Sequence, residues 1–368
     1  MNYLKLTLFL VLFSLANNLF SQEDEEVEMV VAANVEVDSS GISPEAQTFY
    51  NDGITAFEQE NFNAAVEAFS QAVELAPEFT KALNNRAYAY LALNNEADAK
   101  KDFLQLVEID PTMANIFFEL GVLEEKQSNI DEAMEFYTKA IAADASNETY
   151  FYQRGIQHFK LKDYESAIKD FTEAIALKKD YAFAYNDRGS AHKMLKNYTA
   201  AIDDYLAATV HDPKLELSFN NLGTAYREKE ELTMAIDAYS RALVLDNKNA
   251  MVLNNRGYAR FLKGDFDEAL KDFDEALKID PNYAFAHNNK ASVFIKLEKY
   301  EEAVKASSKA IDINPDFGYA YCNRGVAQEM LRNEHEACED WVTASSLGVD
   351  LGERYYQSSS CATLNSNK

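Results

Sequence analysis

The chain of 368 residues is organised by a register that recurs every thirty-four residues. Small residues mark this register without an insertion, and between residues 53 and 325 they form nine positions, which we call rungs. Seven rungs are glycine and two are alanine: Gly53, Ala87, Gly121, Gly155, Gly189, Gly223, Gly257, Ala291 and Gly325. A period of this length is typical of stacked repeats, so the sequence predicts a repeat array rather than independent globular domains.

Each repeat carries further markers at fixed distances from its rung. An alanine follows twelve residues later in all nine repeats, and an aromatic residue follows sixteen residues later in eight, with Ser307 as the exception. Five of the six prolines stand twenty-four residues after a rung. We interpret each repeat as two helices, in which the rung faces the alanine, the aromatic ring fills the adjoining space and proline ends the second helix.

This pattern resembles the tetratricopeptide repeat family over residues 46–351. The resemblance implies an all-α fold, a right-handed superhelical α-solenoid of nine helix-turn-helix units with a short C-terminal capping segment. Residues 22–45 are expected to form a flexible acidic lead-in, and residues 352–368 a cap or tail. The units are expected to start near residues 46, 80, 114, 148, 182, 216, 250, 284 and 318.

Five repeats carry an arginine immediately before the rung, and the same repeats carry an aspartate sixteen residues after that arginine. The four repeats without the arginine have alanine or phenylalanine in place of the aspartate. We therefore expect partly buried, bidentate ion pairs within the repeats, and we favour this over arginines that line a ligand pocket. The pairs are Arg86–Asp102, Arg154–Asp170, Arg188–Asp204, Arg256–Asp272 and Arg324–Asp340.

The first helices of the family line a concave groove, so candidate peptide-binding residues are sought on them. Asparagine stands two residues before the rung in six repeats, at Asn51, Asn85, Asn221, Asn255, Asn289 and Asn323. This row resembles the asparagine ladder with which some members hold a peptide backbone, because an amide both donates and accepts hydrogen bonds. Alternatively, the asparagines only build the helix. Further candidate groove residues are aromatic: Tyr88, Phe183, Phe261, Phe285 and Tyr319.

The chain is strongly acidic, with 35 Lys and Arg against 61 Asp and Glu and a net charge of −26. Binding to nucleic acid or to an anionic lipid surface needs clustered cations, so neither partner is expected. The family's carboxylate clamp of lysines and arginines is also not found, which makes an acid-rich C-terminal tail a poor ligand. The expected partner is a protein or peptide, and the oligomeric state is left open.

The first twenty-one residues have the pattern of a secretory signal peptide. Lys5 precedes an apolar run from Leu6 to Leu15, and Ser21 provides a small residue at the cleavage site. The run is short for a membrane anchor, which is the alternative interpretation. We expect an exported protein, periplasmic or secreted, without a membrane span once the signal is removed.

The sequence has no recognisable catalytic or nucleotide-binding motif, so we expect neither an enzyme nor a cofactor. His158 and His192 share a repeat position, but two histidines without carboxylate or thiolate support do not predict a metal site. After the ninth repeat, residues 351–361 must cover the open end of the array. We expect a Cys338–Cys361 disulfide at this end, with Cys322 left over.

Two functions follow from this interpretation. The first is a scaffold that holds extended segments of partner proteins in the groove. The alternative is a structural element of an envelope complex that acts through its acidic convex face or its ends.

Overall fold

The computed structural model describes residues 41–359 and 361, and the regular structure in these residues is entirely α-helical. This confirms the predicted all-α fold of paired helices. The proposed signal peptide and most of the acidic lead-in lie outside the described residues. The chain divides between Leu195 and Lys196 into two compact units, each of which is described by itself.

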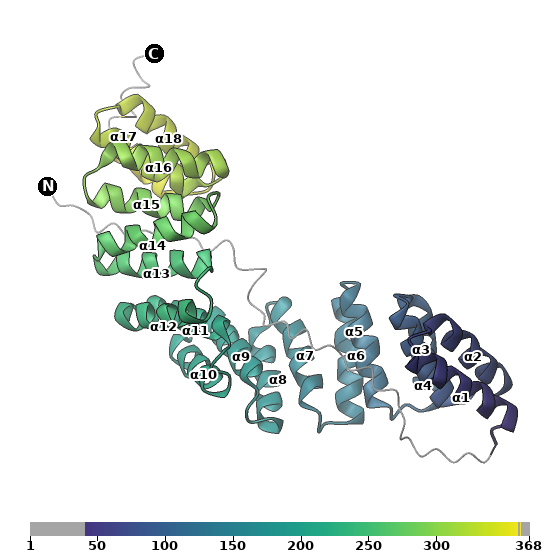
Figure 1. Ribbon diagram of the computed structural model, residues 1–368. Helices are drawn as coiled ribbons and strands as arrows, with labels where there is room; N and C mark the ends of the chain where they lie inside the picture. Colours follow the sequence, from purple (N-terminus) through teal and green to yellow (C-terminus); the bar gives the residue numbers. More distant parts are fainter. Residues whose placement is uncertain (1–40, 360, 362–368) are drawn as a thin grey trace. The chain divides into compact units, whose positions relative to one another are not determined.

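The first unit runs from α1 to α9, from purple to teal in Figure 1. Its helices are α1 (Pro44–Glu58), α2 (Phe62–Leu75), α3 (Thr80–Ala92), α4 (Glu96–Ile109), α5 (Ala114–Lys126), α6 (Ile130–Ala143), α7 (Glu148–Lys160), α8 (Tyr164–Leu177) and α9 (Ala182–Met194).

The second unit continues from α10 to α19, from teal to yellow in Figure 1. Its helices are α10 (Tyr198–His211), α11 (Glu216–Glu228), α12 (Leu232–Leu245), α13 (Ala250–Lys263), α14 (Phe266–Ile279), α15 (Ala284–Lys296), α16 (Tyr300–Ile313), α17 (Gly318–Met330), α18 (Glu334–Ser346) and α19 (Asp350–Ser358).

Within each unit, helices pack in chain order, as a stack of helical pairs requires. A first helix packs on the second helix of its own repeat, and that second helix packs on the first helix of the next repeat. First helices of successive repeats also contact one another, as α11, α13, α15 and α17 do in the second unit. These four helices therefore form one layer, whose side away from the second helices we call the first-helix surface.

The rung glycines allow close approach between the two helices of a repeat. A Cβ atom at Gly53 would lie 2.5 Å from the Phe69 ring, and one at Gly223 would lie 2.7 Å from the Tyr239 ring. The expectation that the rung faces the alanine was therefore wrong, because the nearest group is the aromatic ring four residues further on. Both rings are fully buried and form the centre of their repeats.

Two local features end the helices: a residue in the left-handed conformation and a side chain that binds the backbone. After most first helices one residue adopts the left-handed conformation, as in Lys162 with φ 63° and Glu230 with φ 61°, and the chain reverses into the second helix. After most second helices, an Asp or Asn side chain accepts a hydrogen bond from the backbone N–H of the second residue after it. Asp110 Oδ1, for example, accepts from Thr112 N at 2.9 Å. Where proline stands at the intervening position, as Pro111 does, it blocks further helix.

The C-terminal end of the second unit is covered by α19, which packs on α18. Trp341 of α18 stacks on Tyr355 of α19 at a centroid distance of 5.4 Å. Cys338 and Cys361 form a disulfide beside these rings, with a Cα–Cα distance of 5.5 Å. Cys322 is a buried free thiol, and burial followed by the charge of Asp340 raises its pKa to about 12. The thiol is therefore neutral and poorly reactive.

No helix in the described part of the chain is both long and apolar enough to cross a bilayer.

Candidate binding surface

The arginines before the rungs form bidentate ion pairs with the aspartates of their own repeats in four cases. Arg86 donates through Nε and Nη2 to the two carboxylate oxygens of Asp102 at 2.8 and 2.7 Å. The same two-point contact joins Arg154 to Asp170, Arg256 to Asp272 and Arg324 to Asp340. Each aspartate is at least nine-tenths buried, so these charges are satisfied inside the repeat.

The fifth proposed pair, Arg188–Asp204, has its two residues in different units, and it stays a prediction. Within the first unit, Arg188 Nη1 donates to Thr172 Oγ1 at 3.1 Å. This contact shows that a hydroxyl residue also binds the arginine.

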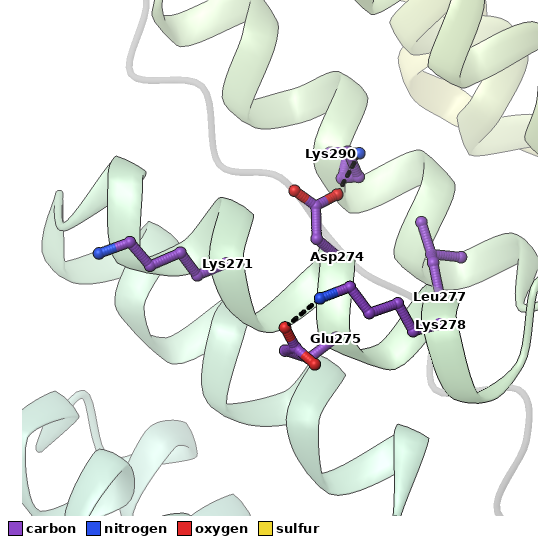
Figure 2. A pocket seen from close by; sticks show the side chains of 6 residues that line it. All are labelled: Lys271, Asp274, Glu275, Leu277, Lys278 and Lys290. Atoms are coloured by element: carbon purple, nitrogen blue, oxygen red, sulfur yellow. Dashed lines mark hydrogen bonds and ion pairs between the residues drawn. The ribbon is translucent and has the colours of Figure 1, made fainter.

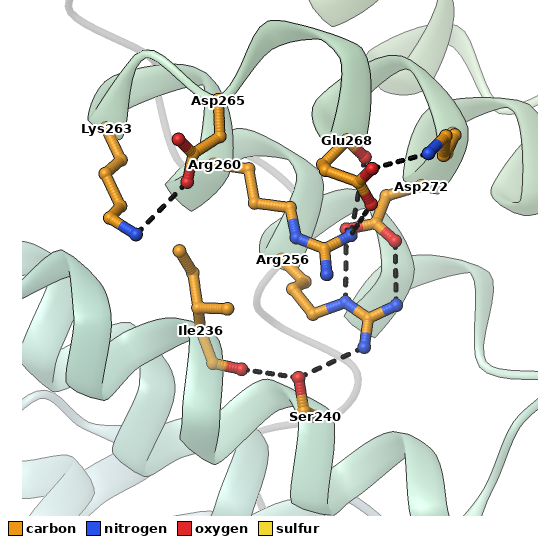
Figure 3. A network of polar contacts seen from close by, with 9 residues as sticks. Ile236, Ser240, Arg256, Arg260, Lys263, Asp265, Glu268 and Asp272 are labelled. Carbon is orange, nitrogen blue, oxygen red and sulfur yellow. Dashed lines mark hydrogen bonds and ion pairs between the residues drawn. The ribbon is translucent and has the colours of Figure 1, made fainter.

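A hydroxyl of the preceding repeat completes each arginine site, and we call the three residues a triad. In the triad of Figure 3, Arg256 binds Asp272 and also donates through Nη1 to Ser240 Oγ at 3.1 Å. Ser240 in turn donates to the backbone oxygen of Ile236 at 2.7 Å, and Arg260 adds a second cation 2.7 Å from Asp272. The arginine thus ties its own second helix to that of the repeat before. The hydroxyl residues are Ser70, Thr138, Thr172, Ser240 and Ser308.

Sequence reasoning missed these hydroxyls, although a signal was present. Each stands sixteen residues before its arginine, and two repeats without arginine replace all three triad members by apolar residues. One apolar set is Leu104, Leu120 and Phe136, and the other is Leu206, Leu222 and Ala238.

In the eighth repeat, Lys290 stands at the position that arginine occupies in the triads. Its ammonium pairs with Asp274 of the preceding repeat at 2.5 Å. Figure 2 shows the residues that line a shallow cleft here: Lys290 and Asp274, Lys271, Leu277, and Lys278 paired with Glu275 at 2.5 Å. Because the acids of this cleft are already paired with its lysines, we do not regard it as the main binding site.

The predicted asparagine ladder connects neighbouring first helices. Nδ2 of Asn289 donates to Asn254 Oδ1 at 2.9 Å, and Nδ2 of Asn323 donates to Asn288 Oδ1 at 2.8 Å. Asn255 donates likewise to Asn220, and Asn85 to the Tyr50 hydroxyl. Asn85, Asn221, Asn289 and Asn323 are buried, Asn255 is half-buried, and Asn51 is exposed and accepts from Gln47. These contacts support the alternative in which the row builds the stack.

The positions that interrupt the asparagine row carry polar groups with similar roles. Asp187 accepts from the Tyr152 hydroxyl at 2.8 Å, and Glu119 accepts from the Tyr88 hydroxyl at 3.0 Å. Burial raises the pKa of Glu119, and the hydrogen bond from the Tyr88 hydroxyl partly offsets this increase. The proposed groove residue Tyr88 is therefore half-buried and bonded between two first helices.

The other proposed aromatic groove residues differ in exposure. Phe261 is buried, with its ring 6.0 Å from that of Tyr258. Phe183, Phe285 and Tyr319 are half-buried, and the Phe285 ring also lies 4.9 Å from that of Phe317. These three rings, like that of Tyr88, are therefore partly accessible to a ligand.

A row of half-buried apolar residues runs along the first helices of the second unit. It occupies the position six residues before each rung, and it consists of Leu217, Met251, Phe285 and Tyr319. In the first unit the same position is mostly polar, with Gln47, Lys81, Asn115 and Thr149 before Phe183. The apolar character of the row is therefore concentrated in the second unit.

Family models for tetratricopeptide repeats match this chain along most of the described helices. Five such models, described as "Tetratricopeptide repeat" or "TPR repeat", between them match residues 50–181 and 223–331. The chain belongs to the tetratricopeptide repeat family. This membership supports a role as a protein–protein interaction scaffold.

Individual relatives share short stretches with this tetratricopeptide repeat protein. The "Protein STIP1 homolog" of Dictyostelium discoideum is 32% identical over 93 residues, which are 23% of this chain and 16% of the relative. "Tetratricopeptide repeat protein 36" of Xenopus tropicalis is 37% identical over 93 residues, which are 24% of this chain and 46% of the relative. The chain thus spans less than half the length of either relative.

A solved structure shares the fold at low identity. The C-terminal part of a TPR repeat-containing protein from Cytophaga hutchinsonii has a TM-score of 0.56 and 17% identity, covering 65% of this chain and 98% of that one. At this identity the similarity establishes the fold alone.

Proposed function

We propose that this protein is an exported scaffold that holds extended segments of partner proteins on the first-helix surface of its second unit. The observation that carries the proposal is the half-buried apolar row Leu217, Met251, Phe285 and Tyr319. Apolar side chains left accessible at regular spacing on a folded protein are typical of binding sites, and aromatic rings among them are frequent anchors.

The spacing of the row also favours an extended ligand. Neighbouring packed helices lie about 8–10 Å apart, so the row offers one apolar contact at each such step. A polyproline II segment has three residues per turn and rises about 3.1 Å per residue, so one of its faces repeats every ~9 Å. We therefore expect a partner segment with an apolar side chain at roughly every third position.

Affinity capture from an extract of the source cells tests this proposal. The bait is residues 22–368, compared with Leu217→Gln/Met251→Gln on the first-helix surface and with Val244→Gln on α12 as a matched control. We expect the double variant to lose a partner that the control retains, with both variants folded by circular dichroism. A partner retained by the double variant and lost by the control would contradict the proposal.

A second candidate function is supported by a different set of exposed apolar residues. Leu206 and Val210 of α10 and Val244 of α12, all on second helices, are 41%, 73% and 83% exposed. Such side chains suit a contact with a neighbouring subunit, as a structural element of an envelope complex would require. The Val244→Gln variant above distinguishes this function from the first.

We also propose that the chain is exported through its N-terminal segment and acts in the periplasm or outside the cell. The Cys338–Cys361 disulfide fits an oxidising compartment. Cell fractionation and mass spectrometry of the N-terminus test this: a mature chain that begins near Gln22 outside the cytoplasm is expected, and an intact cytoplasmic chain would contradict it.

A further inference from the structure

The sequence ahead of the repeats contains a short apolar segment, residues 29–35, which lies outside the described residues and reads MVVAANV. Six of its seven residues are apolar and none is charged, although the sequence on both sides is strongly acidic. The acids before it are Glu23, Asp24, Glu25, Glu26 and Glu28, and those after it are Glu36 and Asp38. An uncharged window of this length, rich in valine and without proline, is prone to aggregate when it is left uncovered. A surface that covers it would therefore benefit the protein.

The apolar row of the second unit matches this segment in charge. Leu217, Met251, Phe285 and Tyr319 are each half-buried, so part of every side chain is accessible. The residues three and four positions further along each helix share the face of the row residue, and all of them are uncharged. They are Asn220, Asn221, Asn254, Asn255, Asn288, Asn289, Cys322 and Asn323. The row thus belongs to an uncharged helix face in a chain whose net charge is −26.

The spacing of the segment also agrees with that of the row. Met29, Ala32 and Val35 stand three residues apart, so in a polyproline II conformation they lie on one face at steps of about 9 Å. Packed helices lie about 8–10 Å apart, so these side chains can contact consecutive members of the row. The equivalent positions of the first four repeats are polar and do not offer such contacts. These positions hold Gln47, Lys81, Asn115 and Thr149.

The link between the segment and the repeats is short. Residues 36–43 join Val35 to Pro44 at the start of α1, and fully extended they span at most about 30 Å. The first helices α1, α3, α5, α7 and α9 follow one another along the first unit (Figure 1), so passing from α1 to α9 takes four steps of about 8–10 Å. Crossing the first unit therefore takes the whole link or more, which favours the row of a second copy over that of the same copy.

We propose that residues 29–35 of one copy bind the apolar row of a second copy, so that two chains associate by exchanging these segments. This inference rests on the proposed function, because the same row is taken to bind partner proteins, and it names a competitor that the chain itself supplies. Reciprocal exchange makes two equal contacts and closes the pair, so each weak contact is strengthened by the other. The acids on both sides of the segment repel those of other segments and so disfavour aggregation of segments with one another.

Sedimentation velocity of the purified chain, residues 22–368, tests this association without any partner protein. We expect a shift from monomer to dimer with rising concentration, and a dissociation constant on the order of 10 µM for contacts this small. Met29→Gln/Val35→Gln in the segment and Leu217→Gln/Met251→Gln in the row should each weaken the dimer at least about tenfold, because each places amides in an apolar contact. The matched controls, expected to change it little, are Val27→Gln/Val37→Gln beside the segment and Val244→Gln on α12.

Mixing the two weakened variants separates docking of the segment on the row from any other contact between copies. The segment variant has an intact row and the row variant has an intact segment, so a mixed pair recovers one of the two contacts. We expect the mixture to associate at concentrations where neither variant does so alone, with both variants folded by circular dichroism.

Three results would overturn the inference: a chain that stays monomeric, association that survives either variant, or a mixture that associates no better than its components. The sedimentation experiment measures the mass of the chain's own assemblies, whereas the capture experiment detects a partner protein. A row that binds a partner but not the segment would therefore refute this inference alone and leave the proposed function standing.

Discussion

At the scale of single residues, the arginine triad joins three helices through one side chain. Arg86 of α3 binds Asp102 of α4 and donates to Ser70 of α2 at 3.3 Å. Its side chain is 16% exposed and that of Asp102 is 6% exposed, so the ion pair is largely withdrawn from water. Such a pair contributes little net stability over an apolar equivalent, but loss of one partner leaves a buried charge.

Because loss of one partner is more costly than replacement of the whole triad, we predict different effects for a single and a triple substitution. The triple substitution copies a repeat in which all three triad positions are apolar. Asp102→Ala is expected to lower the free energy of unfolding by about 3–5 kcal/mol, because Arg86 loses its acid. The triple change Ser70→Leu/Arg86→Leu/Asp102→Ala copies Leu206, Leu222 and Ala238 and should recover most of the loss. Urea denaturation followed by circular dichroism measures both. An unchanged midpoint for Asp102→Ala would show that the ion pair is unimportant.

A second residue-scale prediction concerns Glu216, at the start of α11. Burial, and then the charge of Asp246, raises the pKa of Glu216 to about 7. The folded protein therefore holds this proton more tightly than the unfolded chain, and the contribution of Glu216 to stability falls as pH rises from about 4.5 to 7.

We expect Glu216→Gln to raise the free energy of unfolding by about 1–2 kcal/mol at pH 8, a figure reduced for partial solvation of the carboxylate. At pH 4 the substitution should have little effect, because the glutamate is then largely protonated in both states. Denaturation at the two pH values, with the exposed Glu275→Gln as control, is the measurement. An equal effect of Glu216→Gln at both pH values would refute the expected linkage.

At the scale of elements, the turn inside most repeats has a residue other than glycine in the left-handed conformation, which strains the backbone. Gly264 is in the left-handed conformation at φ 93°, but the equivalent residue in the other repeats is not glycine, as at Lys162 and Glu230. An L-residue other than asparagine is disfavoured there because its Cβ approaches the following carbonyl oxygen.

Replacing these residues is therefore expected to stabilise the repeats. Lys162→Gly and Glu230→Gly should each raise the free energy of unfolding by about 0.5–1 kcal/mol, whereas Gly264→Ala should lower it by a similar amount. Thermal denaturation of the three variants measures the effect. Destabilisation by both glycine substitutions would mean that the flexibility of the unfolded chain outweighs the strain.

Much of the helical pattern could be predicted from the thirty-four-residue register, because each marker has a local consequence for helix packing or helix ends. The hydroxyls of the triads could have been found by comparing positions sixteen residues before each arginine. The asparagine row was harder, since spacing places a side chain on a helix but does not show how deeply a neighbouring helix covers it. The division near Leu195 has no sequence signal, because the register continues through it unchanged.

At the scale of the whole molecule, two classes of surface are available for partners. The first helices of the second unit carry the half-buried apolar row Leu217, Met251, Phe285 and Tyr319. The second helices α10 and α12 carry the strongly exposed Val210 and Val244. An acidic chain with these features is suited to bind proteins, and the two surfaces predict different contacts with a partner.

The most direct test is site-specific photocrosslinking in the source cells. A benzoylphenylalanine is placed at Met251 on the first-helix surface or, in a matched variant, at Val244 on α12. We predict that position 251 crosslinks a partner through an extended segment, identified by mass spectrometry, and that position 244 does not crosslink the same partner. Crosslinking at position 244 with none at position 251 would contradict the central claim and favour a structural assembly role.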